Sequence, residues 1–133
     1  GNHAQGVASA CKKLKINCTI VMPITTPEIK IKDVKRFGAK IIQYGDDVNS
    51  ALEKAKSISK KRQLAFVHPF DDPYTIAGQG TIGKEILEDN NNFDAIFVPV
   101  GGGGILAGIS SWIAQHDKKV KIIGAVFSES IKW

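Results

Sequence analysis

Four consecutive glycines, Gly101, Gly102, Gly103 and Gly104, form the segment of the sequence best suited to chemistry. They follow an apolar run at 96–100 and precede a stretch with helical spacing. Glycine costs chain entropy, so such a run is expected where backbone N–H groups must approach a ligand closely. The amino end of a helix adds unpaired donors and a positive dipole end. The pattern predicts an anion-binding loop, with a phosphate as the expected ligand, and a flexible strand-to-helix turn is the alternative.

The opening of the chain carries a second group that could bind an oxygen ligand. Gly1, Asn2 and His3 precede a helical stretch of small residues. An amide side chain and several backbone donors at a helix amino end can hold a carboxylate or a phenolic oxygen. The alternatives are that Asn2 is a helix cap and that His3 is a surface histidine.

The residues after the four glycines restrict the kind of phosphate ligand. A P-loop needs lysine and then serine or threonine, whereas Ile105 and Leu106 follow here. The glycines at 102, 104 and 108 also resemble a variant dinucleotide fingerprint. That site needs an acidic residue at the end of the next strand to bind the ribose, and residues 126–128 contain none. A dinucleotide is therefore the weaker interpretation.

Short apolar runs rich in β-formers alternate with helical spacing along the chain. Strands of this kind are expected at 18–22, 40–44, 64–67, 95–100 and 121–127. Alternation of strands with helices predicts an α/β fold built from parallel βαβ units. The run at 96–100 is almost entirely apolar, which is typical of a strand covered on both faces.

The predicted helices have identifiable ends and apolar stripes. Thr26 is expected to cap the second helix with Pro27 at its first position, and Asp46 or Asp47 begins the third. The fourth runs over 76–89 and the fifth follows Gly104, while 68–75 interrupts the periodicity and marks a boundary. Gly38 is expected to end the second helix. The expected inward residues are Ile31, Val34 and Phe37 in the second helix; Val48, Ala51, Leu52, Ala55 and Ile58 in the third; Ile82, Ile86 and Leu87 in the fourth; and Ile105, Ile109 and Ile113 in the fifth.

Composition excludes several classes of protein. Hydrophobic residues make up 43% and charged residues 23% of the 133, as in ordinary globular proteins. No apolar run approaches the ~18 residues of a membrane-spanning helix. The net charge of +5 comes from lysines scattered over predicted helices, which favours solvated faces over a nucleic-acid surface. Cys11 and Cys18 are too few for a zinc site or a disulfide framework, and reduced thiols favour an intracellular protein, in cytoplasm or organelle.

The two glycine-bearing segments together resemble those of a known family. Gly-Asn-His-Ala-Gln-Gly-Val-Ala at 1–8 resembles the asparagine loop of fold-type II pyridoxal-phosphate enzymes, and residues 98–108 resemble their phosphate-binding loop. Residues 20–23, 37–39 and 76–81 are also similar to that family. Over 1–126 the chain resembles the threonine dehydratases (threonine ammonia-lyases) within it, with serine dehydratases and serine racemase as relatives.

The resemblance implies an architecture, a cofactor and roles for particular residues. The expected fold is part of the two-domain, tryptophan synthase β-like architecture. In it, 1–75 belongs to a small mobile domain with the asparagine loop, and 76–133 belongs to a large domain with the glycine-rich loop. The implied cofactor is pyridoxal 5'-phosphate. Its phosphate would be bound by Gly101, Gly102, Gly103 and Gly104, and its ring hydroxyl oxygen by Asn2. Gly1, Asn2 and His3 would bind the substrate carboxylate.

The implied activity is β-elimination of water from L-threonine or serine, giving 2-oxobutyrate and ammonia from threonine. Such a lyase serves amino-acid metabolism, including isoleucine biosynthesis. It would act on a small amino acid as a homo-oligomer, with neither nucleic acid nor membrane as partner. A noncatalytic module that binds a phosphate ligand and a serine racemase-like enzyme are the alternatives.

The chain departs from the family pattern at functional positions. The family's Schiff-base lysine lies upstream of the asparagine loop, so the resemblance implies an internal fragment that is inactive alone and holds no catalytic residue. Phe127 stands where racemase-like relatives carry a glutamate that binds a cation. We therefore expect no metal site, which favours the dehydratase over the racemase.

Overall fold

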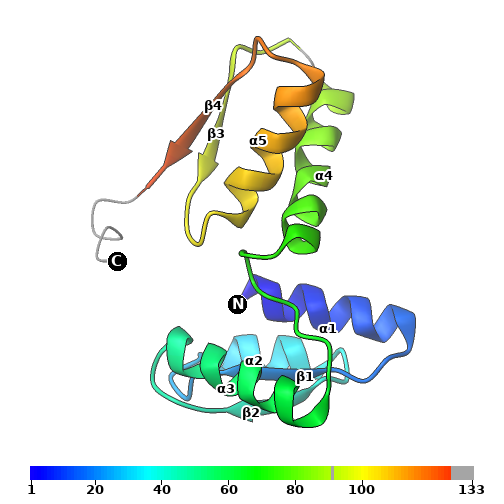
Figure 1. Cartoon of the computed structure of the whole chain (residues 1–133), viewed down its shortest axis with the longest axis vertical. Coiled ribbons are helices and arrows are strands. Elements are labelled where there is room, and N and C mark those ends of the chain that lie inside the picture. Colours follow the sequence, from blue (N-terminus) through cyan, green and yellow to red (C-terminus); the bar gives the residue numbers. More distant parts are fainter. Residues whose placement is uncertain (91, 127–133) are drawn as a thin grey trace. The chain divides into compact units, whose positions relative to one another are not determined.

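The computed structural model describes residues 1–90 and 92–126. Figure 1 shows helices interspersed with strands along the chain, with two helices, at 48–62 and 73–89, following one another directly. Both strand pairs are parallel, which confirms the predicted α/β class. The chain forms two compact units, Gly1–Phe66 and Val67–Trp133. The elements are α1 (Asn2–Leu14), β1 (Thr19–Met22), α2 (Glu28–Lys35), β2 (Lys40–Gln43), α3 (Val48–Arg62), α4 (Pro73–Asp89), β3 (Ala95–Pro99), α5 (Gly104–His116) and β4 (Lys121–Ala125).

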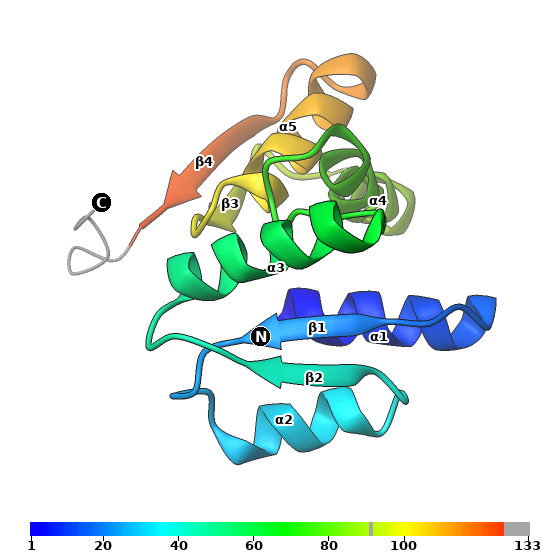
Figure 2. The same cartoon turned by 60° about the horizontal axis from the view of Figure 1, so that its bottom comes forward.

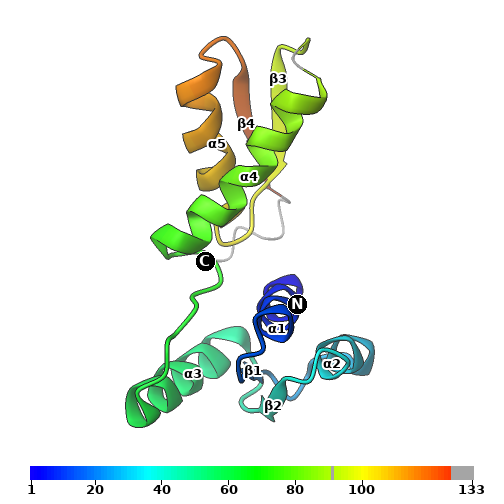
Figure 3. The ribbon, with the colours of Figure 1, turned by 90° about the vertical axis from the view of Figure 1, so that its right-hand side faces the viewer.

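The first unit is built around the parallel pair β1–β2. The register runs from Thr19 opposite Lys40 to Met22 opposite Gln43, and Figure 2 shows the two arrows side by side. Figure 3 shows α3 on one side of this pair and α1 and α2 on the other. The sheet is therefore covered on both faces. The core between the sheet, α1 and α2 consists of Ala8, Ile20, Met22 and Val34.

Helix α2 follows the predicted stripe but not the predicted cap. Val34 is fully buried, and Ile31 and Phe37 pack against the same cluster. Gly38 follows the helix with a φ of 82°, a value that glycine adopts without strain. The capping prediction is wrong, because Pro27 occupies the N-cap position and no side chain caps α2. The Pro27 side chain has no hydrogen-bond acceptor. Thr26, which was expected to cap the helix, lies one residue before the N-cap position.

Helix α3 begins as predicted. The N–H of Ser50 donates to Oδ1 of Asp47 over 2.7 Å, and this bond lowers the pKa of the Asp47 carboxyl. Ala51 is buried, as expected. Val48, expected to face inward, is instead 66% exposed, because it is the first helical residue and lies in the exposed turn beside the cap.

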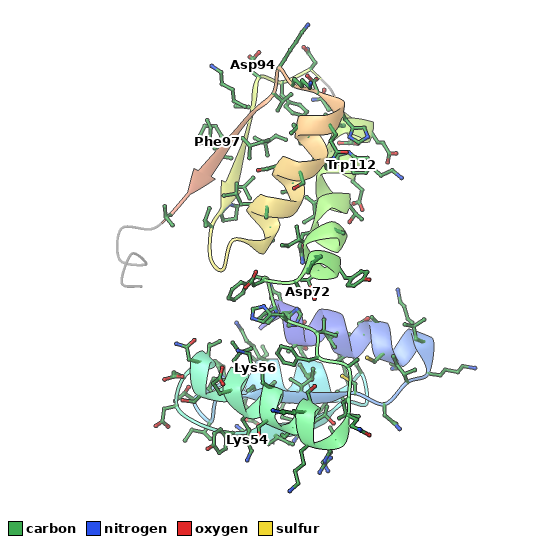
Figure 4. All side chains as sticks on the ribbon, viewed as in Figure 1. Lys54, Lys56, Asp72, Asp94, Phe97 and Trp112 are labelled. Atoms are coloured by element: carbon green, nitrogen blue, oxygen red, sulfur yellow. The ribbon has the colours of Figure 1, made fainter. Side chains whose placement is uncertain are left out.

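The second unit is built on the parallel pair β3–β4, with Ala95 opposite Lys121 and Pro99 opposite Ala125. Both α4 and α5 lie on one side of this pair (Figures 1 and 3), and Val98, Ile109, Ile113 and Val120 form the core there. Phe97 points away from α5 and is 69% exposed (Figure 4). The expectation that both faces of this strand are covered is therefore wrong for the described residues, whose helices cover one face.

The strand predicted at 64–67 does not form. The described sheets pair β1 with β2 and β3 with β4, and residues 64–67 join neither ladder. Leu64 and Val67 are 47% and 48% exposed. A strand requires a neighbour with which to exchange backbone hydrogen bonds, and β-forming composition alone does not supply one.

Candidate functional site

The four glycines at 101–104, here called the glycine loop, connect β3 to α5. The position between a strand and a helix is the one that the sequence predicts. Gly103 is the N-cap of α5 and has a φ of 87°, and no side chain caps this helix. A residue with a Cβ would be strained at that φ, so Gly103 has a conformational reason to be glycine.

The backbone donors of the glycine loop are available to a ligand. The last bond of the ladder joins the N–H of Val100 to the carbonyl of Ala125 over 2.9 Å, and the first helical bond joins Ala107 to Gly103. Between these two bonds, the N–H groups of the four glycines donate to no other residue in the described part of the chain. Unpaired donors at the positive end of a 13-residue helix form a suitable environment for an anion.

The side chain of Phe70 bounds the glycine loop. A Cβ added at Gly102 would overlap the Phe70 ring, and one added at Gly104 would lie 2.9 Å from the Phe70 Cα. A Cβ at Gly101 or Gly103 would meet no atom within 4 Å. Close packing therefore accounts for two of the glycines, whereas sequence reasoning attributed all four to the ligand. The open space at the other two fits a phosphate against the loop.

Phe70 is held by a tight turn at residues 68–72, here called the His68 turn. Nδ1 of His68 accepts the N–H of Asp71 over 2.8 Å and that of Phe70 over 3.3 Å. The rings of His68 and Phe70 meet edge to face, with centroids 4.8 Å apart. The Thr75 hydroxyl donates to the His68 carbonyl over 3.0 Å. These contacts fix the ring that packs on the glycine loop.

Asp72 joins the His68 turn to α4. Its Oδ1 accepts the N–H of Thr75 over 2.9 Å, and Figure 4 shows Asp72 at the amino end of this helix. The helix starts at Pro73, three residues before the predicted 76. The sequence pattern indicated only an interruption at 68–75. It predicted neither the contact of Phe70 with the glycine loop nor the Asp72 cap. The signal for the cap was present, since aspartate followed by proline is typical of N-cap and first helical positions.

Close contact between α4 and α5 fixes the direction of the helix that follows the glycine loop. A Cβ at Gly108 would lie 2.5 Å from the carbonyl oxygen of Ile76 and 2.6 Å from the nitrogen of Gly80. These neighbours are backbone atoms, which cannot rotate away. Glycine at 108 thus allows the two helices to touch backbone to backbone.

The asparagine loop lies in the first unit. Gly1 occupies the N-cap position of α1, and Asn2 is the first helical residue, so Asn2 does not have the cap position considered as its alternative. No side chain caps this helix. Asn2 is exposed and His3 is partly buried. These residues and the glycine loop lie in different units.

Other parts of the described chain offer less for chemistry. A groove lined by Ser110, Ala114, Lys118 and their neighbours lies at the carboxyl end of α5, away from the glycine loop. Residues 1–90 and 92–126 contain no group of three or more His, Cys, Asp or Glu side chains able to hold a metal ion. No helix among them is long and apolar enough to span a membrane. Phe127, on which the metal prediction depends, lies outside the described residues.

Comparison with known proteins identifies the family. Residues 1–131 match the family described as "Pyridoxal-phosphate dependent enzyme". The chain belongs to this family. Pyridoxal phosphate is thus its cofactor class, and the α/β fold is that of the fold-type II pyridoxal-phosphate enzymes.

Individual relatives agree with this assignment. The mitochondrial threonine dehydratase of Saccharomyces cerevisiae is 49% identical over 127 residues, which cover 93% of this chain and 22% of that protein. The catabolic L-threonine dehydratase of Staphylococcus aureus is 46% identical over 131 residues, covering 98% and 38%. The chain therefore spans between about a fifth and two fifths of these relatives.

Solved structures of family members have the same fold. The processed threonine deaminase isoform 2 of Solanum lycopersicum matches with a TM-score of 0.88 at 46% identity, over 95% of this chain and 35% of that one. Serine racemase from Dictyostelium discoideum matches with a TM-score of 0.86 at 31% identity, over 97% and 42%. Sequence identity is thus higher to the deaminase than to the racemase.

Proposed function

We propose that the protein containing this chain is a pyridoxal-phosphate-dependent threonine dehydratase. It would remove water from L-threonine by β-elimination, and hydrolysis of the resulting enamine by one water would release 2-oxobutyrate and ammonia. The observation that supports this most strongly is 46–49% identity to threonine dehydratases and a threonine deaminase over almost the whole chain. The racemase structures, at 31% and 34%, are less similar. The activity and the substrate belong to the longer protein.

The glycine loop would bind the cofactor phosphate. Its four N–H groups have no partner among the described residues, and α5 places its positive end behind them. Two of its glycines face open space in which a phosphate oxygen could approach the backbone. When bound, pyridoxal phosphate supplies the electron sink that stabilises negative charge at the substrate Cα. The contribution of Gly101, Gly102, Gly103 and Gly104 is to hold and orient it.

The asparagine loop would orient both the cofactor ring and the substrate. The amide of Asn2 can donate to the ring hydroxyl oxygen of the cofactor. The N–H groups at the uncapped amino end of α1, with Gly1 and His3, can bind the substrate carboxylate. Hydrogen bonds to charged oxygens are stronger than neutral ones, so these contacts would fix the orientation of the amino acid.

We also propose the domain roles, the assembly and the location of the whole protein. The first unit would belong to the small mobile domain and the second unit to the large domain. We place the boundary between Phe66 and Val67, where the compact units divide, instead of at residue 75 as the resemblance implies, so that Phe70 belongs to the same domain as the glycine loop. Each unit has its own apolar core, as separately moving bodies require.

The protein would assemble as an intracellular homo-oligomer without nucleic acid. Size-exclusion chromatography with light scattering tests the assembly, and a monomeric mass would contradict it.

The activity is tested on the full-length protein. Purified protein is given L-threonine or L-serine, with and without added pyridoxal phosphate, and the 2-oxo acid and ammonia are measured. We expect cofactor-dependent formation of both products in equal amounts, faster from threonine. Conversion of L-serine to D-serine without ammonia would favour the racemase instead. Cofactor binding with no turnover of either amino acid would favour the noncatalytic module.

A further inference from the structure

We propose that Phe70 is a positioning residue for the cofactor phosphate. Its ring supports the glycine loop from within the same unit and holds the loop N–H groups in the conformation that binds the anion. This inference rests on the proposed function, in which the loop binds pyridoxal phosphate. Phe70 would act through the loop and would not itself touch the phosphate.

The contacts of Phe70 with the loop are of two kinds. A Cβ at Gly102 would meet the ring atoms Cδ1, Cγ and Cε1 of Phe70. A Cβ at Gly104 would meet the Phe70 backbone instead, at 2.9 Å from Cα and 3.1 Å from the carbonyl oxygen, as well as Cβ at 3.0 Å. The ring therefore occupies the position that a Cβ at Gly102 would take, and the Cα, Cβ and carbonyl oxygen of Phe70 crowd the position that a Cβ at Gly104 would take.

Phe70 is held firmly enough to act as a support. The imidazole of His68 accepts two backbone N–H groups of the turn and also contacts the Phe70 ring edge to face. The hydroxyl of Thr75 ties the turn to the first residues of α4. A side chain fixed by its own hydrogen-bonded turn costs little additional ordering when a ligand binds nearby.

The loop is constrained from its other end as well. Helix α5 cannot move along α4 without separating the backbone contact at Gly108, and α4 starts at the cap provided by Asp72. The His68 turn, α4, α5 and the glycine loop thus form a closed set of contacts. A loop of four glycines would otherwise sample many conformations, most of which would not direct their N–H groups to one anion.

The two kinds of contact make the inference testable by compensation. Full-length protein is prepared with Gly102→Ala, Gly104→Ala, Phe70→Ala, Phe70→Leu and the two double variants that combine Phe70→Ala with each glycine change. Cofactor affinity is measured by fluorescence titration, and the environment of the bound phosphate by phosphorus NMR. Circular dichroism establishes that each variant is folded.

We expect Gly102→Ala to weaken cofactor affinity by about tenfold or more, because the new methyl displaces the loop from the ring. Phe70→Ala removes the obstructing ring, so the double variant with Gly102→Ala should bind more tightly than Gly102→Ala alone. Gly104→Ala is the matched control: its obstruction is backbone, so Phe70→Ala should not restore it. Phe70→Leu should retain more affinity than Phe70→Ala, with a phosphorus resonance closer to that of the wild type.

Other outcomes separate the two levels of the account. Two results would overturn the positioning role alone. One is that adding Phe70→Ala does not improve the cofactor affinity of Gly102→Ala. The other is that Phe70→Ala by itself leaves both the cofactor affinity and the phosphorus resonance unchanged. Unchanged cofactor affinity in both Gly102→Ala and Gly104→Ala would instead overturn the assignment of the loop to the phosphate, and the role of Phe70 with it.

Discussion

The four glycines of the loop meet different physical requirements. Gly103 has a positive φ, Gly102 and Gly104 lie against Phe70, and Gly101 faces open space. A sequence shows only the run of glycines, and entropy arguments treat its members alike. The contact between residues 70 and 102 is tertiary, and no pattern in the sequence indicates it. For this reason the loop could be predicted, whereas its support could not.

Asn2→Ala should reduce turnover of the full-length protein far more than it reduces stability. Loss of a hydrogen bond to a charged cofactor oxygen should lower kcat by about 10- to 100-fold. Because Asn2 is exposed, the free energy of unfolding should change by about 0.5 kcal/mol or less. Steady-state kinetics and urea unfolding measure the two effects. Asn49→Ala, an exposed asparagine on α3, is the control; equal kcat in both variants would remove Asn2 from the site.

Cys18 should react slowly with thiol reagents. Burial and the neighbouring Cys11 raise the pKa of its thiol from 9.0 to about 11. The folded state therefore favours the protonated thiol. The contribution of this thiol to the free energy of unfolding is fully present below pH 9 and is lost as the pH rises through 11. Iodoacetamide labelling at pH 8, followed by peptide mass mapping, should show slower modification of Cys18 in folded than in urea-unfolded protein. Cys11→Ala should accelerate it; equal rates throughout would contradict the shift.

At the scale of elements, the helix pair α4–α5 depends on glycine for its close approach. Gly80, Gly83 and Gly108 lie where the two backbones meet, with Cβ positions 3.2 Å, 3.4 Å and 2.5 Å from the nearest atom of the facing helix. Such glycines reduce the intrinsic stability of each helix. Packing across the interface compensates, because it brings α5 and the glycine loop into a fixed position.

Gly108→Ala should destabilise the protein, since its methyl would collide with backbone atoms of α4. Overpacking of this kind costs about 1–3 kcal/mol, and a rigid backbone neighbour places the cost at the upper end. Gly78→Ala is the matched control on α4, because no atom lies within 4 Å of its Cβ. That substitution should be neutral or stabilising by up to about 1 kcal/mol. Urea unfolding of the full-length variants gives both free energies of unfolding. Equal values for Gly108→Ala and Gly78→Ala would contradict the close contact at Gly108.

The accuracy of sequence-based prediction differs among elements for identifiable reasons. The stripe of α2 was predictable because the burial of Val34 follows from helical spacing. The cap at Asp47 was predictable because capping is local. The strand at 64–67 was predicted wrongly because pairing depends on a distant partner. Exposure of Phe97 likewise depends on what covers the second face of β3, which the apolar run does not specify.

At the scale of the whole molecule, cofactor binding should raise the free energy of unfolding by a measurable amount. A ligand that binds only the folded state raises the free energy of unfolding by about 2.7 kcal/mol at 100 times its Kd. The full-length protein should therefore unfold at higher temperature with saturating pyridoxal phosphate than without it. Differential scanning calorimetry at fixed protein concentration measures the difference. A midpoint independent of cofactor would contradict binding to the folded state.

The central claim, that the glycine loop binds the cofactor phosphate, is tested most directly by Gly103→Ala and Gly38→Ala in the full-length protein. Both glycines have similar φ values, 87° and 82°, and neither Cβ would meet an atom within 4 Å. The two substitutions thus impose the same backbone strain, but only one lies in the loop. We predict that cofactor affinity, measured by fluorescence titration, falls by about tenfold or more in Gly103→Ala and stays near wild type in Gly38→Ala. Equal affinities in the two variants would contradict the claim.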